Sequence, residues 1–161
     1  MEKFADCISL ASKKLKFCEE LLLKTYPMIQ DPKILLPIVS DVYNSLRLAL
    51  MGVLYYELFF KRVKPFSDDL DEQIAVFEDY CMEKYPDLAG FPKEIKELKK
   101  ILDAHKDSSV EFAKNEEIRM FDDNYHSIIV SYKDVSNYLS NAKVFINSLI
   151  HTFDVKLADA S

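Results

Sequence analysis

The fold is decided by residues 46–60, which read LRLALMGVLYYELFF. Apolar residues surround this helical path on nearly every side from about residue 37 to 64, which predicts a central helix packed by several neighbours. The run is too short to span a bilayer and contains Gly52 and Glu57, so we interpret it as core and expect no membrane partner. Arg47 and Glu57 are ten positions apart, so we expect each to pair with another helix or to reach solvent.

An amphipathic helix is predicted before this core segment, over residues 4–22, because its apolar residues recur at spacings of three and four. Pro27 and Pro32 cannot donate a hydrogen bond within a helix and restrict the residues before them. We therefore expect this first helix to stop near Tyr26.

Three more helices are predicted after the core segment. The carboxylates of residues 67–72 suit the start of a helix over 69–84, and Pro92 is placed to open a fourth helix. Ser131 followed by Asp134 resembles a capping signal, after which a strong amphipathic pattern continues to Phe153.

Residues 107–130 interrupt the helical rhythm. The short apolar runs 118–121 and 126–130 flank turn-forming residues, which predicts a two-stranded ribbon with Phe121 opposite His126. On a purely structural interpretation of this region, Phe112 plugs the end of the bundle and Asn124 adopts a left-handed turn conformation.

These patterns predict an all-α fold, an antiparallel bundle of about five helices with a small two-stranded β-ribbon before the last helix. The presence of only 2 glycines favours long helices over many-stranded sheets. We expect one domain over residues 1–153 and a frayed tail over 154–161.

Composition narrows the function classes. The net charge of −6 and the pI near 5.1 disfavour a broad basic surface for nucleic acid or anionic membrane. Cys7, Cys18 and Cys81 form no CxxC pair, so neither a disulfide framework nor a zinc site is indicated. Residues 1–25 contain no signal-peptide pattern. We therefore expect a cytoplasmic protein with no metal and no cofactor.

The sequence has no Walker loop, GxGxxG, HExxH or GxSxG motif. The best remaining candidate is Arg119 followed seven positions later by His126, which share a face either on a helix or diagonally across the predicted ribbon. The alternative is that Arg119 pairs with Glu116, Glu117 or Asp122 at the surface and that His126 is an ordinary strand residue.

The helix order, with an aromatic-rich second helix (Tyr43, Ala49, Tyr55, Tyr56, Phe59) and a last helix preceded by an Arg and a His, resembles the HEPN family of small helical bundles. Active members of that family are metal-independent ribonucleases that work as dimers. The resemblance implies that His126 acts as general acid or base on the ribose hydroxyl and leaving oxygen, while Arg119 holds the phosphate.

The last third of the chain extends this likeness. A stretch with no function attached is similar to small uncharacterised archaeal proteins of HEPN-like build, and it consists of Ser109, Val110, Glu111, Phe112, Lys114, Asp123, Asn124 and Tyr125. Of these residues, Asp123, Asn124 and Tyr125 are candidate binding residues. The same stretch can be a structural turn.

Two function classes follow. The first is a non-catalytic HEPN-like module, a homodimer through the apolar faces of its long helices, that binds a protein partner or a nucleotide. The second is a metal-independent HEPN-type ribonuclease or toxin that acts on RNA through Arg119 and His126. The acidic balance of the chain favours the module, because Asp122 and Asp123 repel a phosphate near those residues.

Overall fold

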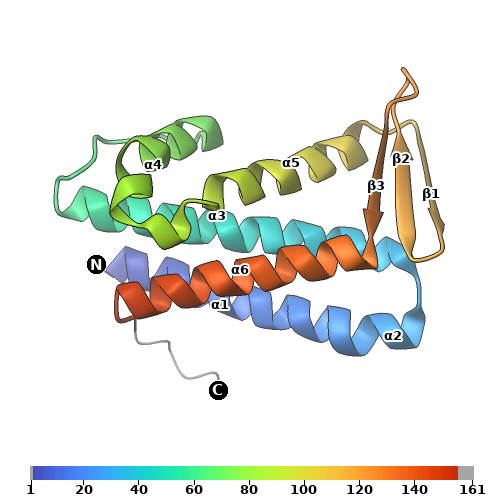
Figure 1. The fold of residues 1–161 in the computed structure, drawn as a ribbon, viewed down its shortest axis with the longest axis horizontal. Helices are drawn as coiled ribbons and strands as arrows, with labels where there is room; N and C mark the ends of the chain where they lie inside the picture. The colour runs from blue at the N-terminus through green and yellow to red at the C-terminus, as the bar shows by residue number, and fades with distance from the viewer. Residues whose placement is uncertain (1, 156–161) are drawn as a thin grey trace.

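The computed structural model describes residues 2–155 as a mainly helical protein with a small antiparallel sheet. Helices α1 (Glu2–Glu20), α3 (Leu35–Phe59), α5 (Phe91–Asp107) and α6 (Tyr132–Thr152) run side by side in alternating directions (Figure 1). Helix α4 (Leu70–Lys84) packs on α3 at one end, and the sheet stands at the other end. The predicted bundle of about five helices is confirmed.

Helix α3 is the centre of the core, and α1, α4, α5 and α6 all contact it. At Gly52 an added Cβ atom would lie 3.2 Å from Ile8 Cδ1 and 3.3 Å from Cys7 Cβ, so α1 and α3 approach closely there. The helical stretch Pro32–Phe59 is long and apolar enough to cross a membrane, so the expectation that the apolar run is too short was wrong. Half of its most apolar window is nevertheless buried inside the fold. A core helix of a soluble protein has the same property.

The first helical segment continues beyond the predicted stop near Tyr26. A π-helical turn over Leu21–Thr25 leads into α2 (Tyr26–Ile29), and the amide of Tyr26 donates to the carbonyl of Leu21. Because this turn widens the helix just before Pro27, the chain passes the proline without breaking. The segment ends where Gln30 adopts a left-handed conformation with φ of 52°.

Most of the predicted helix signals are confirmed. The side chain of Asp69 caps α4, Pro92 lies in the first turn of α5, and Ser131 and Asp134 form a complete capping box for α6. Helix α3 ends at Phe59 rather than near residue 64, because Lys61 takes a left-handed conformation with φ of 56°.

The ribbon has three strands, so the prediction of two was wrong. Strands β1 (Val110–Lys114), β2 (Glu117–Phe121) and β3 (Ser127–Ser131) form an antiparallel sheet in that order. The missed hairpin turns at Asn115 and Glu116, whose φ angles of 52° and 62° suit a type I′ turn. This turn contains no glycine, which is why the sequence did not reveal it. Phe112 stacks on Phe121 within the sheet and does not plug the bundle.

The second hairpin differs from the prediction by one residue. Phe121 pairs with Ser127 rather than with His126, and the amide of Asp122 donates to the carbonyl of His126. The Asp122 carboxylate accepts the amides of Asn124 and His126, each at 2.9 Å, and this side-chain turn shapes the loop. Consequently the left-handed residue is Tyr125, with φ of 63°, and not Asn124.

The two faces of the sheet differ. Ile118, Met120 and Val130 on the inner face are buried in the same apolar core as the helices.

Of the tail predicted over 154–161, residues 156–161 lie outside the described part of the chain. Val155 is packed against the core, and its amide donates to the carbonyl of Ile150.

Candidate functional site

Arg119 and His126 lie on opposite sides of the sheet. Arg119 lies directly opposite Ile129, and Asp122 pairs with His126. Side chains alternate between the faces along a strand, so odd-numbered Arg119 and even-numbered His126 project to different faces of this hairpin. A cavity of about 170 Å³ beside α5 is lined by Met120, Asp122, His126 and Ile128, among others, and Arg119 does not line it.

Each of the two residues has an acidic partner of its own. Arg119 Nη2 lies 3.2 Å from Glu117 Oε2, which is the surface pair that the sequence offered as an alternative to catalysis. His126 Nδ1 lies 3.1 Å from Asp122 Oδ2, and the His126 side chain is 82% exposed. Within one chain these two residues therefore do not converge on one phosphate-binding pocket.

The candidate binding residues form the tip of the β2–β3 hairpin. Asp123 accepts a hydrogen bond from the hydroxyl of Ser109, and the Tyr125 side chain projects into solvent. Burial raises the pKa of the Asp122 carboxyl, but hydrogen bonds from His126 and Asn124 outweigh it and hold this pKa below its usual value. The Asp122 carboxylate is therefore ionised at neutral pH, which disfavours phosphate ligands at the tip.

The outer sheet face is the feature that sequence reasoning missed. We use this name for the side chains of Val110, Phe112, Phe121 and Ile129, together with the charged residues Lys114, Glu117 and Arg119. Val110, Phe112 and Ile129 are 42–56% exposed although all three are large and apolar. The alternation of Val110 and Phe112 before Asn115 was the available signal, but only the third strand brings these residues together.

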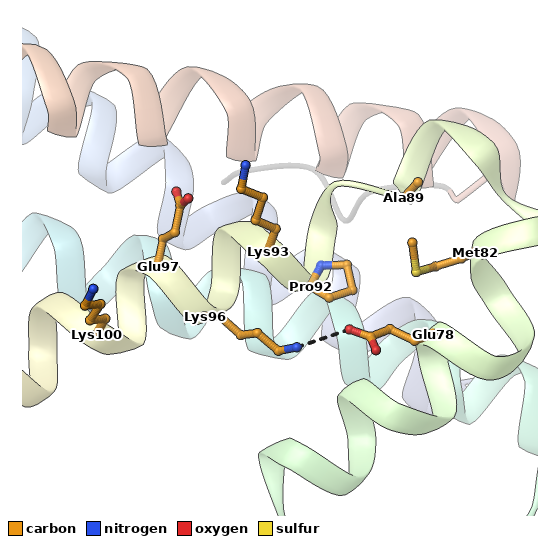
Figure 2. A pocket seen from close by; sticks show the side chains of 8 residues that line it. All are labelled: Glu78, Met82, Ala89, Pro92, Lys93, Lys96, Glu97 and Lys100. Carbon is orange, nitrogen blue, oxygen red and sulfur yellow. Dashed lines mark hydrogen bonds and ion pairs between the residues drawn. The ribbon is translucent and has the colours of Figure 1, made fainter.

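A second surface feature is an open cavity of about 370 Å³ between α4 and α5. Figure 2 shows Lys93, Lys96 and Lys100 extending along α5 beside Glu97, with Glu78 on α4. Lys96 is committed to an ion pair with Glu78 at 3.2 Å. The cavity therefore combines charges of both signs over an apolar floor of Met82, Ala89 and Pro92.

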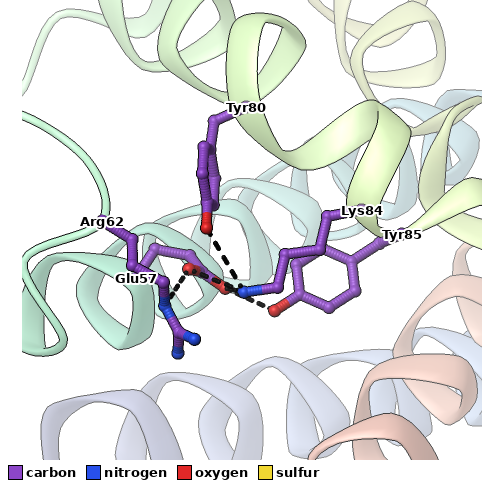
Figure 3. Close-up of polar contacts among 5 residues, drawn as sticks. All are labelled: Glu57, Arg62, Tyr80, Lys84 and Tyr85. Carbon is purple, nitrogen blue, oxygen red and sulfur yellow. Dashed lines mark hydrogen bonds and ion pairs between the residues drawn. The ribbon is translucent and has the colours of Figure 1, made fainter.

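A polar cluster around the buried Glu57 joins α3 to α4 at the end opposite the sheet. Figure 3 shows Arg62, Lys84 and Tyr85 converging on Glu57, whose side chain is fully buried. Lys84 Nζ lies 3.0 Å and 3.1 Å from the two carboxylate oxygens, Arg62 Nε lies 2.9 Å from Oε2, and the Tyr85 hydroxyl donates to Oε1.

Burial and the bond to Glu57 raise the pKa of Tyr85 far above its usual value, so its phenol stays protonated. Glu57 thus finds the partner on another helix that the sequence predicted. Arg47 instead donates from Nη2 to the carbonyl of Asp68 at 3.1 Å, in the loop before α4 rather than on another helix. Since every oxygen of Glu57 is engaged, this cluster is an anchor between helices rather than a reactive site.

The described residues offer no obvious metal or thiol chemistry. Within residues 2–155, no group of three or more His, Cys, Asp and Glu side chains is placed to hold a metal ion. Burial raises the pKa of both Cys18 and Cys81 to about 12, and it also raises that of Cys7. A thiol that stays protonated is a poor nucleophile.

Comparison with known proteins adds no family. No family model matches the chain, and neither the curated proteins nor the solved structures yielded a match. The likeness to HEPN proteins therefore stays a prediction from the sequence.

Proposed function

We propose that this chain is a non-catalytic, intracellular interaction module that associates with a second copy of itself through its sheet. The observation that carries this proposal is the exposure of Val110, Phe112 and Ile129 on the outer sheet face. Arg119 lies between Phe112 and Ile129, but clustered exposed apolar side chains are costly in water and commonly mark a contact with another protein.

The separation of Arg119 from His126 supports the non-catalytic part of the proposal. A ribonuclease needs its general base and its phosphate-binding group within reach of one scissile bond. Each residue instead has an acidic neighbour, Glu117 for Arg119 and Asp122 for His126. The HEPN-type ribonuclease stays the competing hypothesis, and it requires a second chain to complete the site.

The test of self-association is the mass of the protein in solution. Light scattering at micromolar concentrations is expected to give about twice the 18.7 kDa of one chain. A mass that stays at one chain at every concentration would contradict the proposal.

The catalytic alternative has its own assay. Wild type and His126→Ala are incubated with single-stranded RNA and a metal chelator, and cleavage is followed on a gel. The proposal expects no difference between them. If the wild type cleaves RNA and His126→Ala does not, the ribonuclease hypothesis replaces this proposal.

The lysines of α5 favour a second candidate, nucleotide binding at the cavity between α4 and α5. Lys93 and Lys100 line this cavity, and neither has an ion-pair partner among residues 2–155. Titration calorimetry with ATP tests this candidate. Binding that Lys93→Glu and Lys100→Glu each weaken would support it, and heat changes that both variants retain would exclude this cavity.

A further inference from the structure

The second copy can be placed more closely, because one edge of the sheet lacks the usual protection. Strand β3 is an edge strand and reads Ser-Ile-Ile-Val-Ser, with no charge and no proline. Natural edge strands are normally blocked by charges, proline or bulges, since unpaired backbone groups bind other strands. The opposite edge, β1, carries Glu111 and Lys114. Both edges lie near other elements, β1 near residues 32–34 and β3 near α5 and α6, so the difference between them is the lack of charge on β3.

The hydrogen-bond pattern identifies which backbone groups of β3 are free. The Asp122 amide donates to the His126 carbonyl, and the Tyr132 amide donates to the Glu116 carbonyl. Bonded pairs alternate in an antiparallel ladder, so Ile128 and Val130 bond to β2. The N–H and C=O groups of Ser127 and Ile129 therefore point away from β2.

Ser131 marks the end of this free edge. Its amide points the same way but donates to the Asp134 carboxylate at 3.0 Å, within the capping box that starts α6. An incoming strand consequently finds its hydrogen-bonding partners at Ser127 and Ile129.

A groove follows this edge. A cavity of about 230 Å³ is lined by Ile128, Ile129 and Val130 in succession, with Ile101 of α5 and Tyr138 of α6 among its other residues. Ile129 faces the outer side of the sheet while its two neighbours face inward, so a cavity that touches all three must run along the strand edge.

We propose that two copies of this chain pair β3 with β3 in antiparallel orientation about a twofold axis at Ile128, which gives one continuous six-stranded sheet. This inference rests on the proposed self-association. In this register Ser127 of each copy lies opposite Ile129 of the other, so the free N–H and C=O groups of both residues are used. Ile128 meets Ile128 at the axis, in the groove.

Charge favours a second copy as the occupant. Each chain carries a net charge of −6, so two copies repel unless they meet through neutral segments such as β3. Glu97 and Lys100 both line the groove, which offers charges of both signs to a twofold partner. In the six-stranded sheet the outer faces of both copies lie on the same side, so Ile129 approaches the partner while Val110 and Phe112 on β1 stay at the surface.

The experiment combines a backbone change with a cross-link. Ile129→Pro removes an outward N–H that the single chain does not use, and proline is tolerated at such edge positions. Glu111→Pro makes the same change at the opposite edge, where the N–H also points away from β2. Sedimentation equilibrium is expected to show a dissociation constant at least roughly tenfold weaker for Ile129→Pro and an unchanged one for Glu111→Pro.

The cross-link reports the register independently of stability. Opposed residues at a non-hydrogen-bonded position have Cα atoms about 4.5 Å apart, within the range for a disulfide. Ile128→Cys is therefore expected to give a covalent dimer on mild oxidation, while wild type with its three native cysteines and Val110→Cys do not. If Ile129→Pro fails to fold by circular dichroism, this cross-link decides the question.

Two results overturn the inference and they can be told apart. A wild-type dimer that Ile129→Pro leaves intact and Ile128→Cys does not cross-link rejects edge pairing but retains self-association through another surface. A wild type that stays a single chain rejects both proposals.

Discussion

At one end of the bundle Glu57 is fully buried and each of its oxygens has a partner, whereas at the other end Phe112, Ile129 and the free edge of β3 face water. The first end satisfies its polar groups within the chain. The second end leaves both apolar side chains and backbone groups without partners on one side. Apolar side chains are exposed at both ends, since Phe59 and Phe60 near Glu57 are 59% and 45% exposed. The difference therefore lies in the polar groups, and we expect the Glu57 end to contribute mainly to stability.

The largest expected effect concerns the end of the bundle that contains Glu57. Glu57→Ala opens a cavity in the core and leaves the Tyr85 hydroxyl without its acceptor, so we expect about 4 kcal/mol of lost unfolding free energy, measured by urea denaturation. Glu78→Ala removes the exposed pair with Lys96 and is expected to cost less than about 1 kcal/mol. Equal losses in the two variants would remove the distinction between an anchor and a surface pair.

The next effect separates the two faces of the sheet. Ile118 is fully buried on the inner face, so Ile118→Ala is expected to cost about 3 kcal/mol. Phe112→Ser on the outer face is expected to cost under about 1 kcal/mol when the protein is dilute and monomeric. Thermal unfolding at low concentration checks both values. A large loss for Phe112→Ser would show that the outer sheet face stabilises the single chain.

A smaller effect is expected at Glu94, the second buried carboxylate. Burial raises the pKa of Glu94 to about 6, although a bond from Asn141 at 3.4 Å opposes it, and Oε1 of Glu94 has no partner among the described residues. Because the pKa of Glu94 in the folded protein lies above the ordinary value of 4.5, the unfolding free energy of the protein falls as pH rises from about 4.5 through about 6.

Glu94→Gln removes this charge and with it the loss of unfolding free energy at neutral pH. We expect the variant to be up to about 2 kcal/mol more stable than wild type at pH 7 and equal to it near pH 4. Denaturant titrations at the two pH values measure the difference. A variant that is less stable at pH 7 would mean that the ionised carboxylate is well solvated or paired in the fold.

The smallest effect concerns the turn that the sequence concealed. Glu116 has a φ of 62°, which glycine adopts without strain, so Glu116→Gly is expected to stabilise the protein by about 1 kcal/mol. Glu117→Gly, in the adjoining strand, is expected to destabilise it by a similar amount. Thermal unfolding distinguishes the two signs, and a loss for both variants would argue against the type I′ turn.

The helices were predictable from the sequence because their signals are local. Spacings of three and four, the Asp69 cap, Pro92 and the pairing of Ser131 with Asp134 all act within a few residues. The same local signals misplaced the helix end near Tyr26, because a π-helical turn carried the chain past Pro27. The central position of residues 46–60 followed from their apolar character on every side.

The sheet was decided by tertiary structure. The Asn115–Glu116 turn contains no glycine that would mark it in the sequence. The partner of Phe121 depends on strand register, which is set by contacts between distant residues. A shift of one residue moves a side chain to the other face of a sheet. The sequence by itself therefore determined that this chain forms a bundle with a capped last helix, whereas only the fold placed Arg119 and His126 on opposite faces and left β3 at an open edge.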